Sequence, residues 1–179
     1  TQGYERVLIN DYSELENNFR EQLNKFNKKA LDEKPLTDKE FERVLNILNG
    51  KSVLQSAIKL REKIDFDRED GTKIYLKLLS ENAEDNIYQV SNQITVQGKY
   101  KNRYDVTILI NGLPLVQIEL KRSGIDINEA INQIDRYRIH SYRGLFHYIQ
   151  IYVVSNSVET RYFANTDAQR LLKSLTFYW

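Results

Sequence analysis

The sequence predicts an α/β fold of the α+β kind, with a mixed β-sheet flanked by helices and a helical N-terminal part. Three observations support this prediction. Residues 105–121 hold two apolar runs that alternate with polar positions around an Asn-Gly pair, as in a β-hairpin. A helical pattern separates them from a strongly apolar run at 148–155, as in a crossover between parallel strands. The first third of the chain repeats apolar residues at helical spacing.

The N-terminal part contains two candidate helix starts. Ser13 with Glu16, and Thr37 with Glu40, both fit the capping-box pattern, in which each side chain binds the backbone of the other residue. An Asn-Gly pair at 49–50 is typical of a helix end. In chain order we expect a short strand within 1–10 and helices at about 13–29, 37–48 and 52–64.

The next segment is predicted to form strands. Residues 65–79 fit a hairpin that turns at an Asp-Gly pair, with the alternate apolar residues from 74 to 78 facing inward. A strand at 87–96 follows, and a basic turn at 98–102 leads into the central hairpin.

The register of the central hairpin follows from its alternation. Positions 106, 108 and 110 hold one apolar set, and positions 116, 118 and 120 hold the other. A two-residue loop would place the sets on opposite faces, because a shift of one residue turns every side chain over. We therefore predict a three-residue loop with Gly112 left-handed, so that Val106 faces Val116 and Asp105 faces Gln117.

This register brings Asp105, Glu119 and Lys121 together on the polar face of the hairpin. Two carboxylates beside a lysine suit Mg²⁺ or Mn²⁺, because these ions prefer oxygen ligands and usually keep several waters. Such an ion can polarise a phosphate, and a lysine can orient the attacking water or stabilise developing charge. A surface ion pair of little energetic value is the alternative, and spacing alone leaves both possibilities open.

Downstream, a helix is expected at about 127–142 and strands at 148–155 and 160–165. Gln133 and Tyr137 are four residues apart and therefore share one face of that helix. Helical spacing by itself favours packing of Tyr137 in the core, with Gln133 at the rim.

Composition and charge limit the class of protein. The 179 residues are 41% hydrophobic and 28% charged, with no apolar run of transmembrane length and no signal-peptide pattern. We therefore expect one domain in the cytoplasm with no membrane partner. The absence of cysteine excludes disulfides and thiolate metal sites. The net charge of +1 does not indicate nucleic acid, although basic residues cluster at 99–103, 121–122 and 136–143.

Several short stretches carry a resemblance to a known family. Asp105, Glu119 and Lys121 on a hairpin resemble the PD-(D/E)xK nuclease core. The surrounding sequence resembles the endonuclease region of type I restriction enzyme R (motor) subunits, most strongly over 86–165. Residues 133–137 match the Q-x-x-x-Y motif of this nuclease type. The matching stretches are NRYDV (102–106), NGLPL (111–115), QIELK (117–121), QIDRY (133–137), SN (155–156) and ETRYFAN (159–165).

The resemblance implies a restriction-endonuclease-like fold and Mg²⁺-dependent hydrolysis of DNA phosphodiester bonds, with Mn²⁺ able to substitute. Asp105 and Glu119 would bind the metal, together with the backbone carbonyl of Ile118. Lys121 would position or activate the attacking water. These roles come from the family pattern and not from spacing alone.

The resemblance also implies that Gln133, Tyr137 and Gln117 contact DNA or support the active site. Residues 1–179, which begin at Thr1 and lack methionine, would be one nuclease domain at the N-terminus of a motor subunit, with a catalytic core at about 86–165. ATP use would belong to a translocase region absent from this sequence. The implied partners are double-stranded DNA and the methyltransferase and specificity subunits. In this family an acidic residue on an earlier helix often joins the active site, and we expect the chain to begin after that helix.

Two alternatives are kept beside this interpretation. Another PD-(D/E)xK nuclease, such as a repair or junction-resolving enzyme, would share the core motif, but the helical N-terminal third and the downstream resemblance argue against it. A non-catalytic docking domain with a nuclease fold would also share it. The intact Asp105, Glu119 and Lys121 argue against that second alternative.

Overall fold

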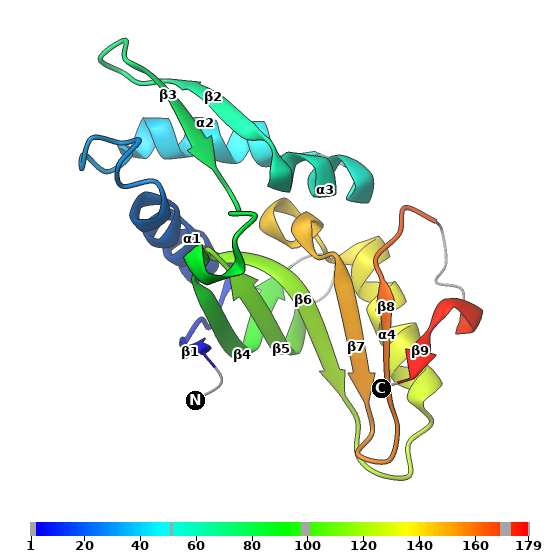
Figure 1. Cartoon of the computed structure of the whole chain (residues 1–179). Helices are drawn as coiled ribbons and strands as arrows, with labels where there is room; N and C mark the ends of the chain where they lie inside the picture. Colours follow the sequence, from blue (N-terminus) through cyan, green and yellow to red (C-terminus); the bar gives the residue numbers. More distant parts are fainter. Residues whose placement is uncertain (1–2, 51, 98–100, 169–172, 179) are drawn as a thin grey trace.

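The computed structural model describes residues 3–50, 52–97, 101–168 and 173–178. Within these ranges a seven-stranded mixed sheet, a separate two-stranded hairpin and four α-helices confirm the predicted fold class (Figure 1). The large sheet contains, in spatial order, β1 (Glu5–Arg6), β4 (Tyr88–Gln97), β5 (Lys101–Ile110), β6 (Leu113–Leu120), β7 (Ile151–Ser155), β8 (Thr160–Ala164) and β9 (Phe177–Tyr178). The helices are α1 (Tyr12–Phe26), α2 (Asp38–Leu48), α3 (Val53–Arg61) and α4 (Ile127–His140).

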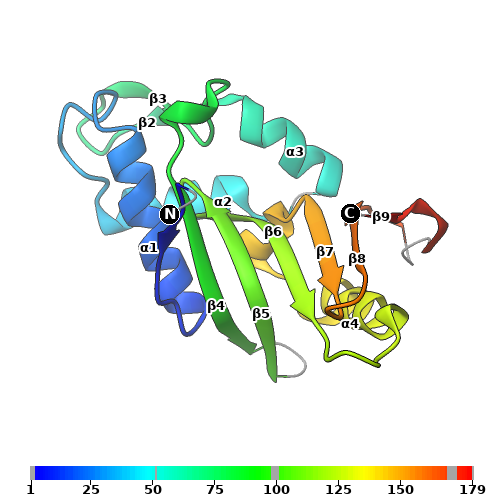
Figure 2. The same cartoon turned by 60° about the horizontal axis from the view of Figure 1, so that its bottom comes forward.

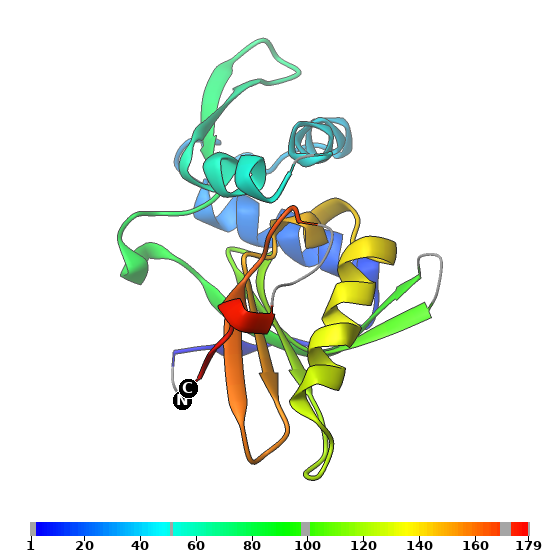
Figure 3. The same ribbon diagram turned by 90° about the vertical axis from the view of Figure 1, so that its right-hand side faces the viewer.

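Strand pairing makes the large sheet mixed. Strands β4, β5 and β6 form an antiparallel meander, β7, β8 and β9 form another, and β1 pairs parallel with β4. Strands β6 and β7 pair parallel and are joined through α4, which confirms the predicted crossover. Figure 3 shows α1 and α4 on one face of the sheet and no α-helix of the described chain on the other. The core lies between that face and these two helices.

A smaller unit sits at one end of the sheet, made of α2, α3 and the hairpin of β2 (Lys63–Asp67) and β3 (Lys73–Lys77) (Figure 1). The hairpin buries Ile74, Leu76 and, just beyond β3, Leu78, as predicted, and it also buries Ile64 and Phe66 on β2. The buried Glu40 at the start of α2 accepts hydrogen bonds from Arg68, which follows β2, with Nη2 and Oε2 3.0 Å apart. This ion pair ties the hairpin to the helix.

The helix starts were predicted with mixed success. The capping box of Thr37 and Glu40 at α2 is confirmed. The box at Ser13 is wrong, because α1 begins earlier, with Asp11 as its N-cap accepting a hydrogen bond from Glu14 N at 2.9 Å. Asn10 N in turn donates to Glu14 Oε2 at 2.7 Å, so backbone N–H groups at the start of α1 are satisfied two to three residues earlier than predicted.

Several element ends differ from the predictions. The helix expected to reach residue 64 ends at Arg61, because the residues from Lys63 onward pair in β2. The helix expected to reach residue 142 ends at His140. The strand expected from residue 148 begins at Ile151, because 144–148 form a 3₁₀ turn. Residues 98–100 of the predicted basic turn lie outside the described residues.

The central hairpin corrects the predicted loop. Its turn has two residues, since Ile110 pairs with Leu113, and Asn111 and Gly112 have φ of 50° and 80°. A bulge at Leu115 then adds one residue to β6 and restores an even register. Val106 therefore faces Ile118 and not Val116, and the two apolar sets still share a face, as the alternation predicted.

Tertiary contacts explain why the turn is tight. The Asn111 side chain accepts a hydrogen bond from Ile87 N at 2.8 Å and donates to Leu78 O at 2.9 Å. Gly112 lies against α1, where a Cβ atom would come within 2.7 Å of Phe19 Cα.

No helix within the described ranges is both long and apolar enough to cross a bilayer.

Candidate active site

The candidate site lies where β5 and β6 pass beneath α4. Asp105 is on β5, Glu119 is on β6, and Lys121 directly follows β6. The odd-numbered residues of β6 face α4, so the polar face of the hairpin is covered by a helix. The apolar residues Val106 and Ile118 are half-buried on the opposite face. Sequence alternation did not reveal which face the helix covers, because both faces of the sheet carry apolar residues.

Glu119 is the most buried acid of the group, at 1% exposure. Its Oε1 accepts a hydrogen bond from Gln133 Nε2 and lies 3.6 Å from Lys121 Nζ. Its Oε2 is buried and accepts no N–H or O–H donor from the described residues, and the Asp105 carboxyl lies within hydrogen-bonding reach of Glu119. Burial, and then the charge of Asp105, raise the pKa of Glu119 from 4.5 to about 8, although Lys121 acts in the opposite direction.

Asp105 is half-buried and reaches the end of β6. Its Oδ2 accepts a hydrogen bond from Leu120 N at 2.9 Å. The β5–β6 register that pairs Val106 with Ile118, continued by one step, brings Asp105 opposite Glu119; the prediction that it faces Gln117 is wrong, because Gln117 pairs with Thr107. The prediction that these two carboxylates converge is confirmed by this geometry, and so is the position of Lys121 beside them.

Gln133 links the site through its amide group. Its Oε1 accepts a hydrogen bond from Lys121 Nζ, and its Nε2 donates to both Glu119 Oε1 and the Tyr137 hydroxyl. Tyr137 is 5% exposed, and its ring packs edge-on against Tyr104 at 4.8 Å between centroids. Burial raises the pKa of the Tyr137 hydroxyl. Tyr137 therefore packs in the core while its hydroxyl joins the polar cluster, so the two interpretations of this pair are compatible.

Gln117 and Ile118 lie one step back along β6. The Gln117 side chain is fully buried, and its Oε1 accepts a hydrogen bond from Thr107 Oγ1 at 3.0 Å. Its Nε2 donates to the Ile118 carbonyl oxygen at 3.3 Å. Gln117 thus touches the carbonyl that the family pattern assigns to the metal, and Thr107 is a supporting residue that the sequence motifs did not reveal.

The donor set fits a hard divalent cation. Two carboxylates and one carbonyl match the few protein ligands that Mg²⁺ usually takes, with water completing the shell. The buried Oε2 of Glu119 accepts no N–H or O–H donor from the described residues, and a cation between Glu119 and the neighbouring Asp105 carboxyl would compensate both charges. Within the described parts of the chain, no third acidic or histidine side chain joins these two. The expected acid from an earlier helix therefore stays a prediction.

A cavity of about 450 Å³ opens beside Lys121 and Gln133. Arg122 and Arg136 line it together with Lys121, which makes the approach to the site mostly cationic, although Glu129 also lines it. Part of the predicted basic cluster thus borders the site, whereas Lys99 lies outside the described residues.

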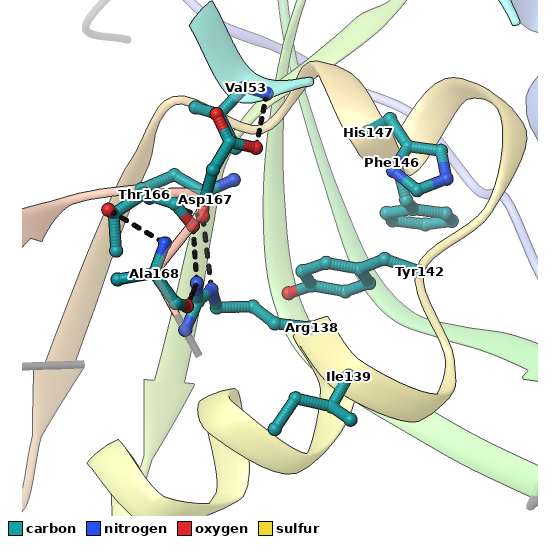
Figure 4. Close-up of a pocket in the computed structure, with 10 residues that line it drawn as sticks. Val53, Arg138, Ile139, Tyr142, Phe146, His147, Thr166, Asp167 and Ala168 are labelled. Atoms are coloured by element: carbon teal, nitrogen blue, oxygen red, sulfur yellow. Dashed lines mark hydrogen bonds between the residues drawn. The ribbon is translucent and has the colours of Figure 1, made fainter. Parts of the chain in front are cut away.

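Arg138, from the same predicted cluster, serves a structural purpose. It lines a second cavity, of about 550 Å³, at the C-terminal end of α4 (Figure 4). Its guanidinium donates to Asp135 Oδ1 at 2.6 Å, to Asn165 Oδ1 at 3.1 Å and to the carbonyl oxygens of Thr166 and Ala168. Because acceptors of its own chain surround it, Arg138 holds residues 165–168 against α4.

Comparison with known proteins places this geometry in context. A family model described as "Type I restriction enzyme R protein N terminus" matches residues 2–170. An endonuclease subunit of a type I restriction enzyme from Staphylococcus aureus (strain COL) is 56% identical over 178 residues, and one from Staphylococcus saprophyticus is 52% identical. Each alignment covers 99% of this chain but 19% of the relative. The EcoprrI endonuclease subunit of Escherichia coli is 43% identical over 92% of this chain and 54% of its own length.

Proposed function

The chain belongs to the family of the type I restriction enzyme R protein N terminus, and from this premise we propose that it is the endonuclease domain of such an R subunit. The proposed activity is Mg²⁺-dependent hydrolysis of phosphodiester bonds in double-stranded DNA, with Mn²⁺ able to substitute. The proposed location is the cytoplasm.

The observation that supports this activity most is the single hydrogen-bonded cluster beneath α4. Gln133 bonds to Lys121, Glu119 and Tyr137 at once, and Asp105 lies beside Glu119. The lysine ammonium, the two carboxyl groups and the amide that hydrogen bonds to them lie at one place. This arrangement suits phosphoryl transfer, which depends chiefly on positioning and charge stabilisation. An ordinary surface ion pair would not need a carboxylate at 1% exposure.

Asp105, Glu119 and the Ile118 carbonyl would hold the metal. When bound, Mg²⁺ would supply positive charge that polarises the phosphodiester and makes water easier to deprotonate. The chain's own part is to bury Glu119 and to hold the half-buried Asp105 beside it. Gln133 keeps Oε1 of Glu119 fixed by hydrogen bonding.

Lys121 is the residue that would act on the nucleophile. Its ammonium is held by Gln133 and lies 3.6 Å from Glu119 Oε1, at the edge of the cationic cavity. From there it would orient a water for attack on phosphorus and stabilise the added negative charge. The water oxygen bonds to phosphorus, the bond to the leaving sugar oxygen breaks, and the proton of the water passes to solvent or to that oxygen.

The chain spans 19% of the staphylococcal relatives, so the activity of the whole protein is a further part of the proposal. We propose that the longer subunit couples this domain to an ATP-driven DNA translocase. It would act with methyltransferase and specificity subunits. The catalytic core would occupy about residues 86–165 of one nuclease domain.

Calorimetric titration of Mn²⁺ into the chain tests the metal site. We expect the wild-type chain to bind and Asp105→Ala and Glu119→Ala to lose binding. Glu129→Ala is the matched control, because it removes an exposed carboxylate that lines the neighbouring cavity. It is expected to keep wild-type affinity. Absence of binding to the wild-type chain, or retention of it by either active-site variant, would contradict the proposal.

A second measurement separates a nuclease from a docking domain. In the assembled restriction complex, Lys121→Ala is expected to abolish DNA cleavage while ATP hydrolysis continues. A docking domain would show unchanged cleavage in this variant, because Lys121 would have no role in the reaction.

A further inference from the structure

One residue in the middle of β4 has a left-handed backbone. Gln93 has φ of 59° within a strand of ten residues. This conformation is unfavourable for a residue with a Cβ atom, and extended strands do not require it. The other described non-glycine residues with positive φ lie in turns or bends: Asp32, Glu33, Asn111 and Ser157. A strained residue inside a regular strand points to a structural requirement at that place.

Gln93 lies directly opposite Asp105. The pairs on either side are Asn92 with Val106 and Ile94 with Tyr104. On both strands the buried positions change between odd and even numbers here, which a regularly alternating strand cannot do. The buried residues are Gln89 and Ser91, then Ile94 and Val96, on β4, and Tyr104, then Thr107 and Leu109, on β5.

The switch of buried positions on β4 and β5 is accompanied by a bend of both strands away from β6. The β5–β6 ladder stops at Val106 and Ile118, although β6 continues to Leu120 and pairs with β7 there. Figure 2 shows β5 and β6 side by side at one end and diverging at the other. The Asp105 carboxylate occupies the space so formed, where its Oδ2 accepts the hydrogen bond from Leu120 N. At the preceding position on β5, Tyr104 is buried, and its ring packs edge-on against the ring of Tyr137.

We propose that Gln93 is a positioning residue whose left-handed backbone aims the Asp105 carboxylate at the end of β6, beside Glu119. Irregularities of this kind occur next to active sites, where they redirect a side chain or end a ladder. The Gln93 side chain is exposed, so the backbone conformation is what matters and not the amide group. The consequence for metal binding rests on the proposed function, whereas the consequence for the Leu120 hydrogen bond does not.

Substitutions at Gln93 separate backbone from side chain. Gln93→Gly keeps the left-handed conformation without strain, and Gln93→Val disfavours it strongly, because a β-branched residue rarely adopts positive φ. Gln93→Thr serves the same purpose if the valine variant does not fold. Glu33→Val is the matched control, since Glu33 has φ of 59° in an exposed turn between α1 and α2.

Each variant is measured by amide hydrogen exchange at Leu120 and by Mn²⁺ titration, and its thermal unfolding is recorded alongside. Without metal, we expect Gln93→Val to speed amide hydrogen exchange at Leu120, and Gln93→Gly to leave it unchanged. In an Asp105→Ala background, Gln93→Val should cause no further change at Leu120. In Mn²⁺ titrations, Gln93→Val should weaken binding about tenfold or more, as loss of support around a metal ligand does. Glu33→Val should lower the midpoint of thermal unfolding and leave both readouts as in the wild type.

The outcomes distinguish the two proposals. Unchanged Leu120 exchange in Gln93→Val and in Gln93→Thr would overturn the positioning role. The positioning role would also be overturned if the wild-type chain binds Mn²⁺ and these two variants bind it with the same affinity. A third outcome is that the wild-type chain binds no Mn²⁺, while Gln93→Val speeds amide hydrogen exchange at Leu120. This result would contradict the proposed nuclease and support the positioning of Asp105 by Gln93.

Discussion

Replacing Glu119 with glutamine should make the metal-free domain more stable at high pH. The folded state raises the pKa of this carboxyl to about 8, against 4.5 for the ordinary group. Between these values folded Glu119 keeps a proton that the unfolded chain releases. Stability of the wild-type chain therefore falls as pH rises through this range and becomes level above it. Glutamine resembles the protonated acid and still offers an oxygen to Gln133, so it removes this dependence.

The size of the effect follows from the same pKa. Each pKa unit corresponds to about 1.4 kcal/mol, so the ionised carboxylate at this position costs at most about 5 kcal/mol. Any opening of the fold that lets water reach Glu119 lowers this figure. Since domains of this size are stabilised by about 5–15 kcal/mol, the difference is large enough to measure.

Urea unfolding followed by circular dichroism provides the assay, with EDTA present and pH varied from about 5 to about 9. The free energies of unfolding of the two proteins should differ by about 1 kcal/mol or less at the acidic end, and the advantage of the Glu119→Gln variant should grow up to about pH 8 and then stay level. Glu129→Gln, at an exposed position on α4, should track the wild-type chain throughout. A stability difference for Glu119→Gln that is independent of pH would refute the reasoning.

Three further predictions concern the metal, the small unit and the turn. Because Glu119 must lose its proton to bind a cation, Mn²⁺ affinity should rise with pH up to about 8, with proton release seen by calorimetry in two buffers. Burial would raise the pKa of Glu40, but hydrogen bonds from Arg68 lower it to about 2; Arg68→Ala should cost about 3 kcal/mol or more in urea unfolding near neutral pH, and less near pH 2. Gly112→Ala places a Cβ atom 2.7 Å from Phe19 Cα at positive φ, and should lower the unfolding midpoint.

The central hairpin shows what alternation can and cannot predict. Side-chain parity is a local property, so the shared face of the two apolar sets could be read from the sequence. The position of the extra residue in β6 could not be read from the sequence, because contacts with residues distant in the chain determine it. Asn111 is bonded to Leu78 and Ile87, and Gly112 is pressed against α1. These contacts fix a two-residue turn and move the irregularity to Leu115.

The candidate site shows the same division. Asp105, Glu119 and Lys121 could be predicted because their types and spacing belong to one hairpin. The Gln133 amide that joins Lys121 to Glu119 depends on how α4 crosses the sheet, and sequence spacing does not determine that crossing. Gln93 carries no motif at all, since its role lies in a backbone angle that glutamine does not favour.

The covering of the polar face by α4 links stability to the proposed chemistry. Lys121 lies 3.6 Å from Glu119, but burial and the charge of Asp105 outweigh it and raise the pKa of Glu119 to about 8, so this carboxyl holds a proton near neutral pH when no metal is bound. A divalent cation between Glu119 and Asp105 would replace that proton and remove the electrostatic cost. Proton and metal therefore compete for the Glu119 carboxylate, and the metal that the proposal requires should also stabilise the fold most where the pH is high enough to remove the proton.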